Sequence, residues 1–258
     1  MVLHCDFYSP VLKRNTHINV ILPTPNETDQ KVKKNLKVLY LLHGLHGDEG
    51  SWLHLSNIER YAYEAGIAVV IPGVGNSFYQ NMAHGEDFFT YVTEELYKFV
   101  QGLFPVSKKR EDTFIAGLSM GGYGAWYLAL ACPEKYAATA SFSGAVDIGF
   151  RYTPVGLGNA PMPFYVDNCF GDPTKIAGSD RDVFALFEKA KAKGIVPRMY
   201  QSCGTADFLY QMNVEAYKKL TEMGAEITWR ETPGIDHVWD FWDSEVRWIL
   251  KNWLLKKK

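Results

Sequence analysis

The segment over residues 112–124 constrains the fold of this chain more than any other stretch of its 258 residues. A short apolar run with strand composition, 113–116, leads into a Gly-x-Ser-x-Gly sequence over 117–121, and an apolar helix-forming segment begins at Ala125. This sequence between a strand and a helix predicts a sharp turn that strains the backbone of its serine and exposes the hydroxyl. The first amides of the helix can stabilise a nearby anion. We therefore interpret Ser119 as a candidate nucleophile.

Strand-like and helix-like segments alternate along most of the chain. We predict eight strands, over 3–8, 17–22, 36–42, 67–71, 113–116, 137–142, 196–202 and 225–231. We predict helices over 51–65, 88–104, 125–132, 181–193, 212–223 and 241–254. This alternation is typical of the α/β class, with a mostly parallel sheet, helices on both faces and an antiparallel pair of strands at the start. Ligands of such sheets bind beyond the carboxyl ends of the strands.

Chain length favours one domain over residues 1–258, because a domain of this size removes roughly 70–75 % of its unfolded surface from water. The segment 145–179 is rich in proline and glycine and is the least regular part of the chain. We expect it to form a small lid or cap over the site.

Composition excludes several classes of partner. The 27 basic and 29 acidic residues give a net charge of −2, which offers no support for nucleic-acid binding. We find no leader-like start and no apolar run long enough to cross a bilayer, so we expect no membrane partner and a cytoplasmic location. The 7 tryptophans and 15 tyrosines are compatible with an aromatic interface in a homo-oligomer.

Four cysteines without C-x-x-C spacing are expected to be free thiols: Cys5, Cys132, Cys169 and Cys203.

A serine nucleophile needs a general base, and the base needs an acid that orients it. In this architecture the acid and then the histidine follow the serine in the chain. His237, after the last predicted strand, is the only histidine downstream of Ser119, so we predict it to be the base. Asp207 follows the strand over 196–202 and is the predicted acid. Three other carboxylates are alternatives: Asp147, Asp172 and Asp236.

An acyl-transfer site also needs two donors for the oxyanion. We predict these to be the backbone N–H of Met120, directly after the serine, and that of Leu45 in the glycine-rich loop 43–47, with Gly44 as the alternative. The histidines at 43, 46 and 54 lack the spacing of a structural zinc site, so we expect no metal. Aromatic side chains that could line an acyl pocket are Trp52, Phe78, Tyr79, Phe88 and Trp126.

The segments 41–47 and 117–122, together with Trp52 and the surroundings of Asp207 and His237, resemble the esterase D and S-formylglutathione hydrolase-like branch of the α/β-hydrolases over essentially the whole chain. The resemblance is strongest to the short tributyrin esterases of lactic acid bacteria and streptococci. It implies the α/β-hydrolase fold and hydrolysis of short-chain acyl esters, without a cofactor, through an acyl-enzyme. S-formylglutathione hydrolases usually carry Gly-Leu-Thr-Cys where this chain has Gly-Leu-His-Gly over 44–47, which favours a plain carboxylesterase.

Three hypotheses follow for the function, and a small-molecule ester is the expected partner of the enzyme. The first is a serine carboxylesterase acting on tributyrin, acetyl or aryl esters. The second is an acyltransferase or a thioesterase, which shares the acyl-enzyme but differs in acceptor or substrate. The third is a non-catalytic scaffold with a hydrolase fold, which has no need of Ser119, Asp207 and His237 together.

Overall fold

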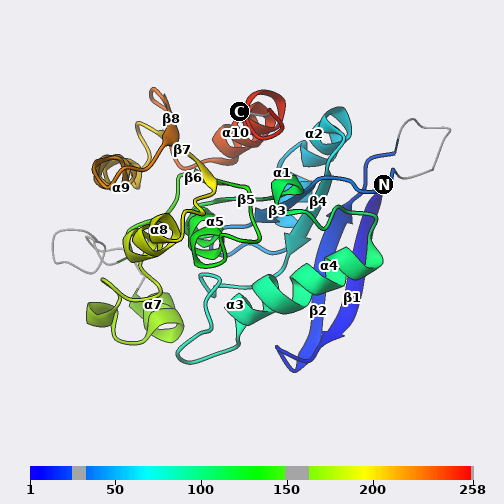
Figure 1. Cartoon of the computed structure of the whole chain (residues 1–258), viewed down its shortest axis with the longest axis horizontal. Coiled ribbons are helices and arrows are strands. Elements are labelled where there is room, and N and C mark those ends of the chain that lie inside the picture. Colours follow the sequence, from blue (N-terminus) through cyan, green and yellow to red (C-terminus); the bar gives the residue numbers. More distant parts are fainter. Residues whose placement is uncertain (25–32, 149–162, 257–258) are drawn as a thin grey trace.

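The computed structural model describes residues 1–24, 33–148 and 163–256 (Figure 1). Its strands form one eight-stranded sheet in the order β1-β2-β4-β3-β5-β6-β7-β8. The first two pairings in this order, β1 with β2 and β2 with β4, are antiparallel, and the others are parallel, which confirms the predicted architecture. The strands are β1 Val2–Ser9, β2 Arg14–Ile21, β3 Val38–Leu42, β4 Ala68–Pro72, β5 Thr113–Leu118, β6 Ala138–Phe142, β7 Arg198–Gly204 and β8 Ile227–Thr232.

Helices cover both faces of the sheet (Figure 1). Side chains from α1, α2 and α10 form the apolar core on one face, and those from α3, α4, α5, α8 and α9 form the core on the other. The four central strands β3 to β6 are buried on both sides, which explains why none of them contains a charged residue. The helices are α1 Ser51–Leu55, α2 Ile58–Ala65, α3 Phe88–Thr90, α4 Tyr97–Leu103, α5 Met120–Ala131, α7 Pro163–Phe170, α8 Val183–Ala192, α9 Tyr210–Glu222 and α10 Trp239–Asn252.

Two predicted helices differ from the observed ones. The helix predicted over 51–65 is two helices, α1 and α2, separated where the Ser56 hydroxyl donates to the carbonyl of Trp52 at 2.5 Å and accepts from the N–H of Ile58 at 3.2 Å. Such local side-chain bonds compete with the helical pattern. The helix predicted over 88–104 contains a π-helical segment, Tyr91–Leu96, between α3 and α4.

Strand register brings two loops of the predicted site together. Leu42, the last residue of β3, pairs with Gly117 near the end of β5. The chain leaves both strands at the same edge of the sheet. The loop 43–47 therefore lies beside the turn that carries Ser119.

The segment 145–179 is only partly described, because residues 149–162 lie outside the described ranges. The helix α7 packs beside the loop 75–85, where the ring of Phe170 lies 5.5 Å from that of Phe78. The ring of Tyr165 lies 5.6 Å from that of His46. The expectation of a lid over the site stays a prediction.

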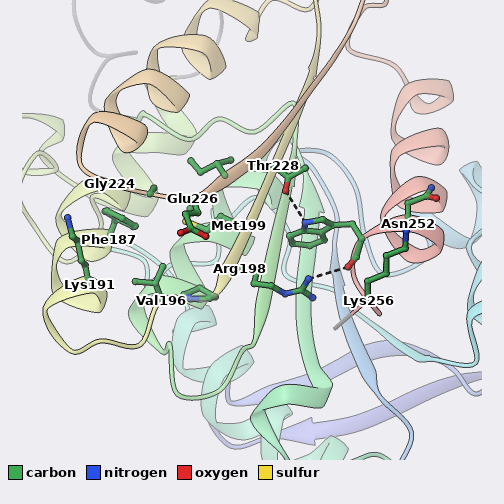
Figure 2. A pocket seen from close by; sticks show the side chains of 14 residues that line it. Phe187, Lys191, Val196, Arg198, Met199, Gly224, Glu226, Thr228, Asn252 and Lys256 are labelled. Atoms are coloured by element: carbon green, nitrogen blue, oxygen red, sulfur yellow. Dashed lines mark hydrogen bonds between the residues drawn. The ribbon is translucent and has the colours of Figure 1, made fainter. Parts of the chain in front are cut away.

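A cavity of about 590 Å³ lies beside β7, β8 and the end of α10 (Figure 2). Arg198 lines this cavity and donates to the carbonyls of Trp253 and Leu254, at 3.3 and 2.8 Å. Its guanidinium carbon lies 4.9 Å from the centroid of the Trp253 ring. These bonds satisfy carbonyls just after α10 and attach the helix to the sheet. Neither Ser119 nor His237 lines this cavity.

In the described ranges, no helix is both long and apolar enough to span a membrane.

Candidate active site

Ser119 occupies a strained turn between β5 and α5. Its backbone has φ 53° and ψ −117°, a conformation that L-residues rarely adopt. The turn is held by the Ser119 N–H, which donates to the carbonyl of Phe142 at 2.9 Å, and by the Ser119 carbonyl, which accepts from the N–H of Ala145 at 3.1 Å. Strain at one residue persists when the surrounding structure over-determines it.

The two glycines of the turn are required by close packing. A Cβ atom on Gly117 would lie 2.3 Å from the carbonyl oxygen of Gly121. A Cβ atom on Gly121 would lie 2.6 Å from the carbonyl oxygens of both Leu42 and His43. The Gly-x-Ser-x-Gly pattern therefore lets the turn press against the end of β3, and this contact places the serine next to the loop 43–47.

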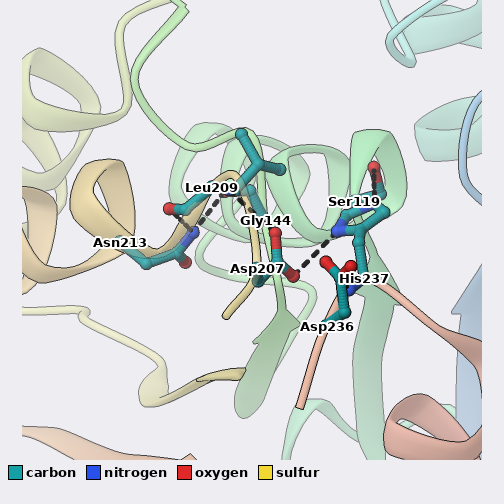
Figure 3. Close-up of polar contacts among 7 residues, drawn as sticks. All are labelled: Ser119, Gly144, Asp207, Leu209, Asn213, Asp236 and His237. Carbon is teal, nitrogen blue, oxygen red and sulfur yellow. Dashed lines mark hydrogen bonds and ion pairs between the residues drawn. The ribbon is translucent and has the colours of Figure 1, made fainter. Parts of the chain in front are cut away.

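The structure brings together three side chains that are far apart in the sequence (Figure 3). The Nε2 atom of His237 lies 3.0 Å from the Ser119 Oγ, and its Nδ1 atom lies 2.8 Å from Oδ2 of Asp207. A carboxylate only accepts hydrogen bonds, so Nδ1 carries the proton and donates to Asp207. The unprotonated Nε2 is then free to accept the hydroxyl proton of Ser119. This is the arrangement that activates a serine for attack on an ester carbonyl.

Asp207 is held in place by its own loop. Its Oδ1 atom accepts the backbone N–H of Leu209 at 2.8 Å, and its side chain is completely buried. Burial raises the pKa of Asp207, but the hydrogen bond and charge of His237, together with hydrogen bonds from Ser143 and Leu209, outweigh this effect, so the net pKa lies below its usual value. The carboxylate is therefore ionised at neutral pH.

The alternative carboxylates occupy other positions. Asp236 accepts the backbone N–H of His237 at 2.7 Å, as a turn residue does. Asp172 accepts the N–H and the hydroxyl of Thr174 at 3.0 and 2.7 Å, which caps a short helical turn. Asp147 lines a different cavity, beside α8.

The loop 43–47 is a tight turn fixed by a buried imidazole. The N–H of Gly47 donates to the Gly44 carbonyl at 3.2 Å, and His46 takes a positive φ of 65° within the turn. The Nδ1 of His43 donates to the same carbonyl at 2.8 Å, and its Nε2 accepts the N–H of Val74 at 3.2 Å. Burial lowers the pKa of His43, so its ring is neutral. Because both ring nitrogens have partners, His43 has no nitrogen left for a metal ion.

Two backbone N–H groups beside Ser119 remain open for a ligand. Met120 is the first residue of α5, so its N–H has no partner within the helix. Within the part of the chain that the structure describes, neither this group nor the N–H of Leu45 donates a hydrogen bond. Both residues line the same cavity as Ser119.

That cavity has a volume of about 560 Å³ and a mostly apolar wall. Its aromatic lining comes from Phe78, Tyr165, Phe208, Trp239 and Trp242. Aromatic side chains near a polar centre are typical of a pocket for a small organic ligand.

Comparison with known proteins places the chain in a family. A family model described as "Putative esterase" matches residues 9–251. An acetyl esterase of Caldicellulosiruptor saccharolyticus is 37 % identical in an alignment 254 residues long that covers 95 % of this chain and 95 % of that protein. The chain belongs to this esterase family and is a carboxylic ester hydrolase.

The esterase is also similar to solved structures of serine hydrolases. A fluorophosphonate-binding serine hydrolase of Staphylococcus aureus has a TM-score of 0.88 at 32 % identity, with 100 % of this chain and 99 % of that chain covered. An S-formylglutathione hydrolase of the same organism has a TM-score of 0.85 at 32 % identity, with 99 % of each chain covered. These likenesses confirm the α/β-hydrolase fold.

The structure corrects part of the predicted acyl pocket of the esterase. Phe78 lines the cavity, whereas Trp52 and Tyr79 are completely buried in the core. The Trp52 indole donates to the carbonyl of Leu42 at 3.0 Å, and the Tyr79 hydroxyl donates to that of His43 at 2.9 Å. They support the end of β3 from opposite faces of the sheet rather than forming the pocket wall. Two other aromatic residues named for the pocket are also core residues outside its lining: Phe88 and Trp126.

Sequence reasoning missed most of the aromatic wall. Phe208 directly follows Asp207, and its ring lies 4.6 Å from that of His237. Trp239 and Trp242 follow His237 at the start of α10, and the ring of Trp242 lies 4.8 Å from the imidazole. Their closeness in sequence to Asp207 and His237 is the signal that could have identified them.

Proposed function

We propose that the esterase is a serine carboxylesterase that hydrolyses short-chain acyl esters through an acyl-enzyme on Ser119. The observation that carries this proposal is the position of the His237 imidazole, 3.0 Å from the Ser119 hydroxyl oxygen and 2.8 Å from the Asp207 carboxylate. One ring can thus accept a proton on one side while a negative charge stabilises its cation on the other.

The reaction has two halves. In the first, the Ser119 Oγ forms a bond to the ester carbonyl carbon, its proton moves to Nε2 of His237, and the carbonyl electron pair moves onto oxygen. Collapse of this intermediate breaks the bond to the alcohol oxygen, which takes the proton from Nε2. In the second half, water gives a proton to Nε2 and adds to the acyl-enzyme. Collapse then releases the carboxylic acid, and Ser119 regains its proton.

We assign the stabilisation of both oxyanions to the backbone N–H groups of Leu45 and Met120. Their place beside Ser119 and their lack of other acceptors among the described residues support this role. The N–H at the start of α5 also carries the partial positive charge of a helix N-terminus.

Labelling of Ser119 distinguishes this proposal from a non-catalytic scaffold. A fluorophosphonate should react with the wild-type protein, because the activated Oγ displaces fluoride from phosphorus. The intact mass then rises by one phosphonyl group, and peptide mapping places it on Ser119. The Ser119→Ala protein should show no such rise. A folded wild-type protein that takes up no label would support the scaffold and reject the proposal.

The acetyl esterase relative supports a short acyl group, and tributyrin is a natural test substrate. We expect kcat/KM for 4-nitrophenyl esters to be highest from acetyl to butyryl and to fall towards octanoyl. The cavity of about 560 Å³ must hold both halves of the ester and later the attacking water, and its aromatic walls have few rotamers with which to expand. An octanoyl ester that turns over as fast as the butyryl ester would contradict this preference.

The similarity to an S-formylglutathione hydrolase supports a second candidate, hydrolysis of thioesters. Comparing kcat/KM for an acetyl ester and for S-formylglutathione separates the two. Transfer to an alcohol is detected by product analysis with a competing alcohol present.

We also propose that residues 1–258 form one domain in which 145–179 is a lid, since Tyr165 of α7 already lines the cavity.

A further inference from the structure

A buried amide lies behind the acid of the proposed active site (Figure 3). Asn213, in the first turn of α9, is completely buried. Its Nδ2 donates to the carbonyls of Gly144 and Leu209, each at 2.9 Å. Its Oδ1 accepts from Nε2 of Gln201 at 2.9 Å. All polar atoms of this side chain are therefore used, and the amide has one fixed orientation.

The two carbonyls belong to different loops. Leu209 ends the acid loop, residues 205–209, and its N–H donates to Oδ1 of Asp207 at 2.8 Å. Gly144 lies in the loop after β6, where the next residue, Ala145, donates its N–H to the carbonyl of Ser119 at 3.1 Å. The side chain of Asn213 thus joins the loop that holds the acid to the loop that holds the nucleophile.

These contacts close a ring. From Ser119 the ring passes through the loop 144–145 to Asn213, then through Leu209 to Asp207, and through His237 back to the Ser119 hydroxyl. Each link is a hydrogen bond of 2.8 to 3.1 Å or a covalent connection between neighbouring residues. A closed ring restricts the acid more than a single tether does, because the loop cannot shift without breaking a buried bond.

Two further tethers of the acid loop run to the loop that carries the histidine. The N–H of Ala206 donates to the carbonyl of Ile235 at 3.1 Å, and the Thr205 hydroxyl accepts the N–H of Gly234 at 2.8 Å. They fix the acid loop to the His237 loop. On the other side, the N–H of Ser143 donates to the carbonyl of Ser202 at 2.8 Å, which joins the strand before the acid loop to the loop after β6. Asn213 adds a second connection to the nucleophile side, and it acts on the far end of the acid loop, beyond Asp207.

We propose that Asn213 is a positioning residue, which sets the distance between Asp207 and the nucleophile turn and so keeps His237 aligned on Ser119. This inference rests on the proposed function. An amide suits the position because two N–H groups in a fixed plane meet two carbonyl oxygens. Aspartate has nearly the same shape but presents an oxygen where these donors stand.

The test is Asn213→Asp, assayed with 4-nitrophenyl acetate. We expect kcat/KM to fall by about 10- to 100-fold with little change in KM, since small misplacement of reacting groups acts on the chemical step. The matched control is Thr139→Val. Thr139 is buried and donates to the carbonyl of Ala125 at 2.9 Å, outside the ring. The control should keep its kcat/KM while losing thermal stability. If Asn213→Asp does not fold, Asn213→Ala takes its place.

A double-mutant cycle distinguishes positioning from a general structural role. In an Asp207→Ala background the acid is gone, so the Asn213 change should lower the residual turnover by less than about twofold. The same factor of loss in both backgrounds would overturn the inference, as would an unchanged kcat/KM in the Asn213 single variant. The proposed function fails separately, if a folded Ser119→Ala protein keeps wild-type turnover.

Discussion

Replacing Ser119 by alanine should lower kcat for 4-nitrophenyl acetate by about 10⁴- to 10⁶-fold, the range seen when a serine hydrolase loses its nucleophile. No other group can then form the acyl-enzyme, and the open amides of Leu45 and Met120 can only assist attack by water. The variant lacks only one oxygen atom, so its folded structure should remain. Steady-state kinetics and a thermal unfolding curve measure the two effects.

Ser107 provides the control for this experiment. It lies before the opposite end of β5, where its hydroxyl donates to the Asp112 carboxylate at 2.7 Å. Ser107→Ala should leave kcat unchanged, although it loses a hydrogen bond of similar length. Wild-type turnover in a folded Ser119→Ala protein would place the nucleophile elsewhere and end the proposal.

Replacing Asp207 by asparagine should lower kcat by about 10³- to 10⁴-fold. The asparagine amide can present an N–H to Nδ1 of His237, which stabilises the tautomer with its proton on Nε2. That tautomer cannot accept the Ser119 proton. The variant also loses the negative charge that stabilises the imidazolium in the transition state. The KM should change little, because the Asp207 side chain is completely buried and does not line the cavity.

Asp236→Asn is a closely matched control. Asp236 precedes His237 in the chain, but its carboxylate accepts only a backbone N–H in the contacts described above. We expect its kcat to stay within about tenfold of wild type, since asparagine keeps an acceptor oxygen at that turn. A larger loss from Asp236→Asn than from Asp207→Asn would reverse the assignment of the acid.

Local sequence patterns were sufficient to predict the strands of the sheet and the turn that carries Ser119. Each of β3 to β6 is a short run without charged residues that ends in a polar or glycine-rich segment, and such a run can be recognised without knowing its neighbours. Ser119 could be predicted because its two glycines and its flanking strand and helix lie within 20 residues of one another. His237 had no downstream competitor.

Other features could not be predicted from local sequence because they depend on how distant elements meet. Trp52 and Phe78 look alike as aromatic candidates, and both are completely buried, yet only Phe78 lines the cavity. The side of a helix or loop that faces the pocket is decided by packing against other elements, which periodicity does not encode.

The sequence alone determined the order of strands and helices along the chain, the strained serine turn and the histidine that lies beside Ser119, because these follow from local chemistry and chain order. Only the tertiary structure decided that Asp207 rather than Asp236 faces the imidazole, and that Asn213 joins the two loops behind it. Both depend on hydrogen bonds between residues as much as 69 positions apart, such as that of Asn213 with Gly144. Contacts of this kind form only when the sheet has brought the ends of its strands to a common edge.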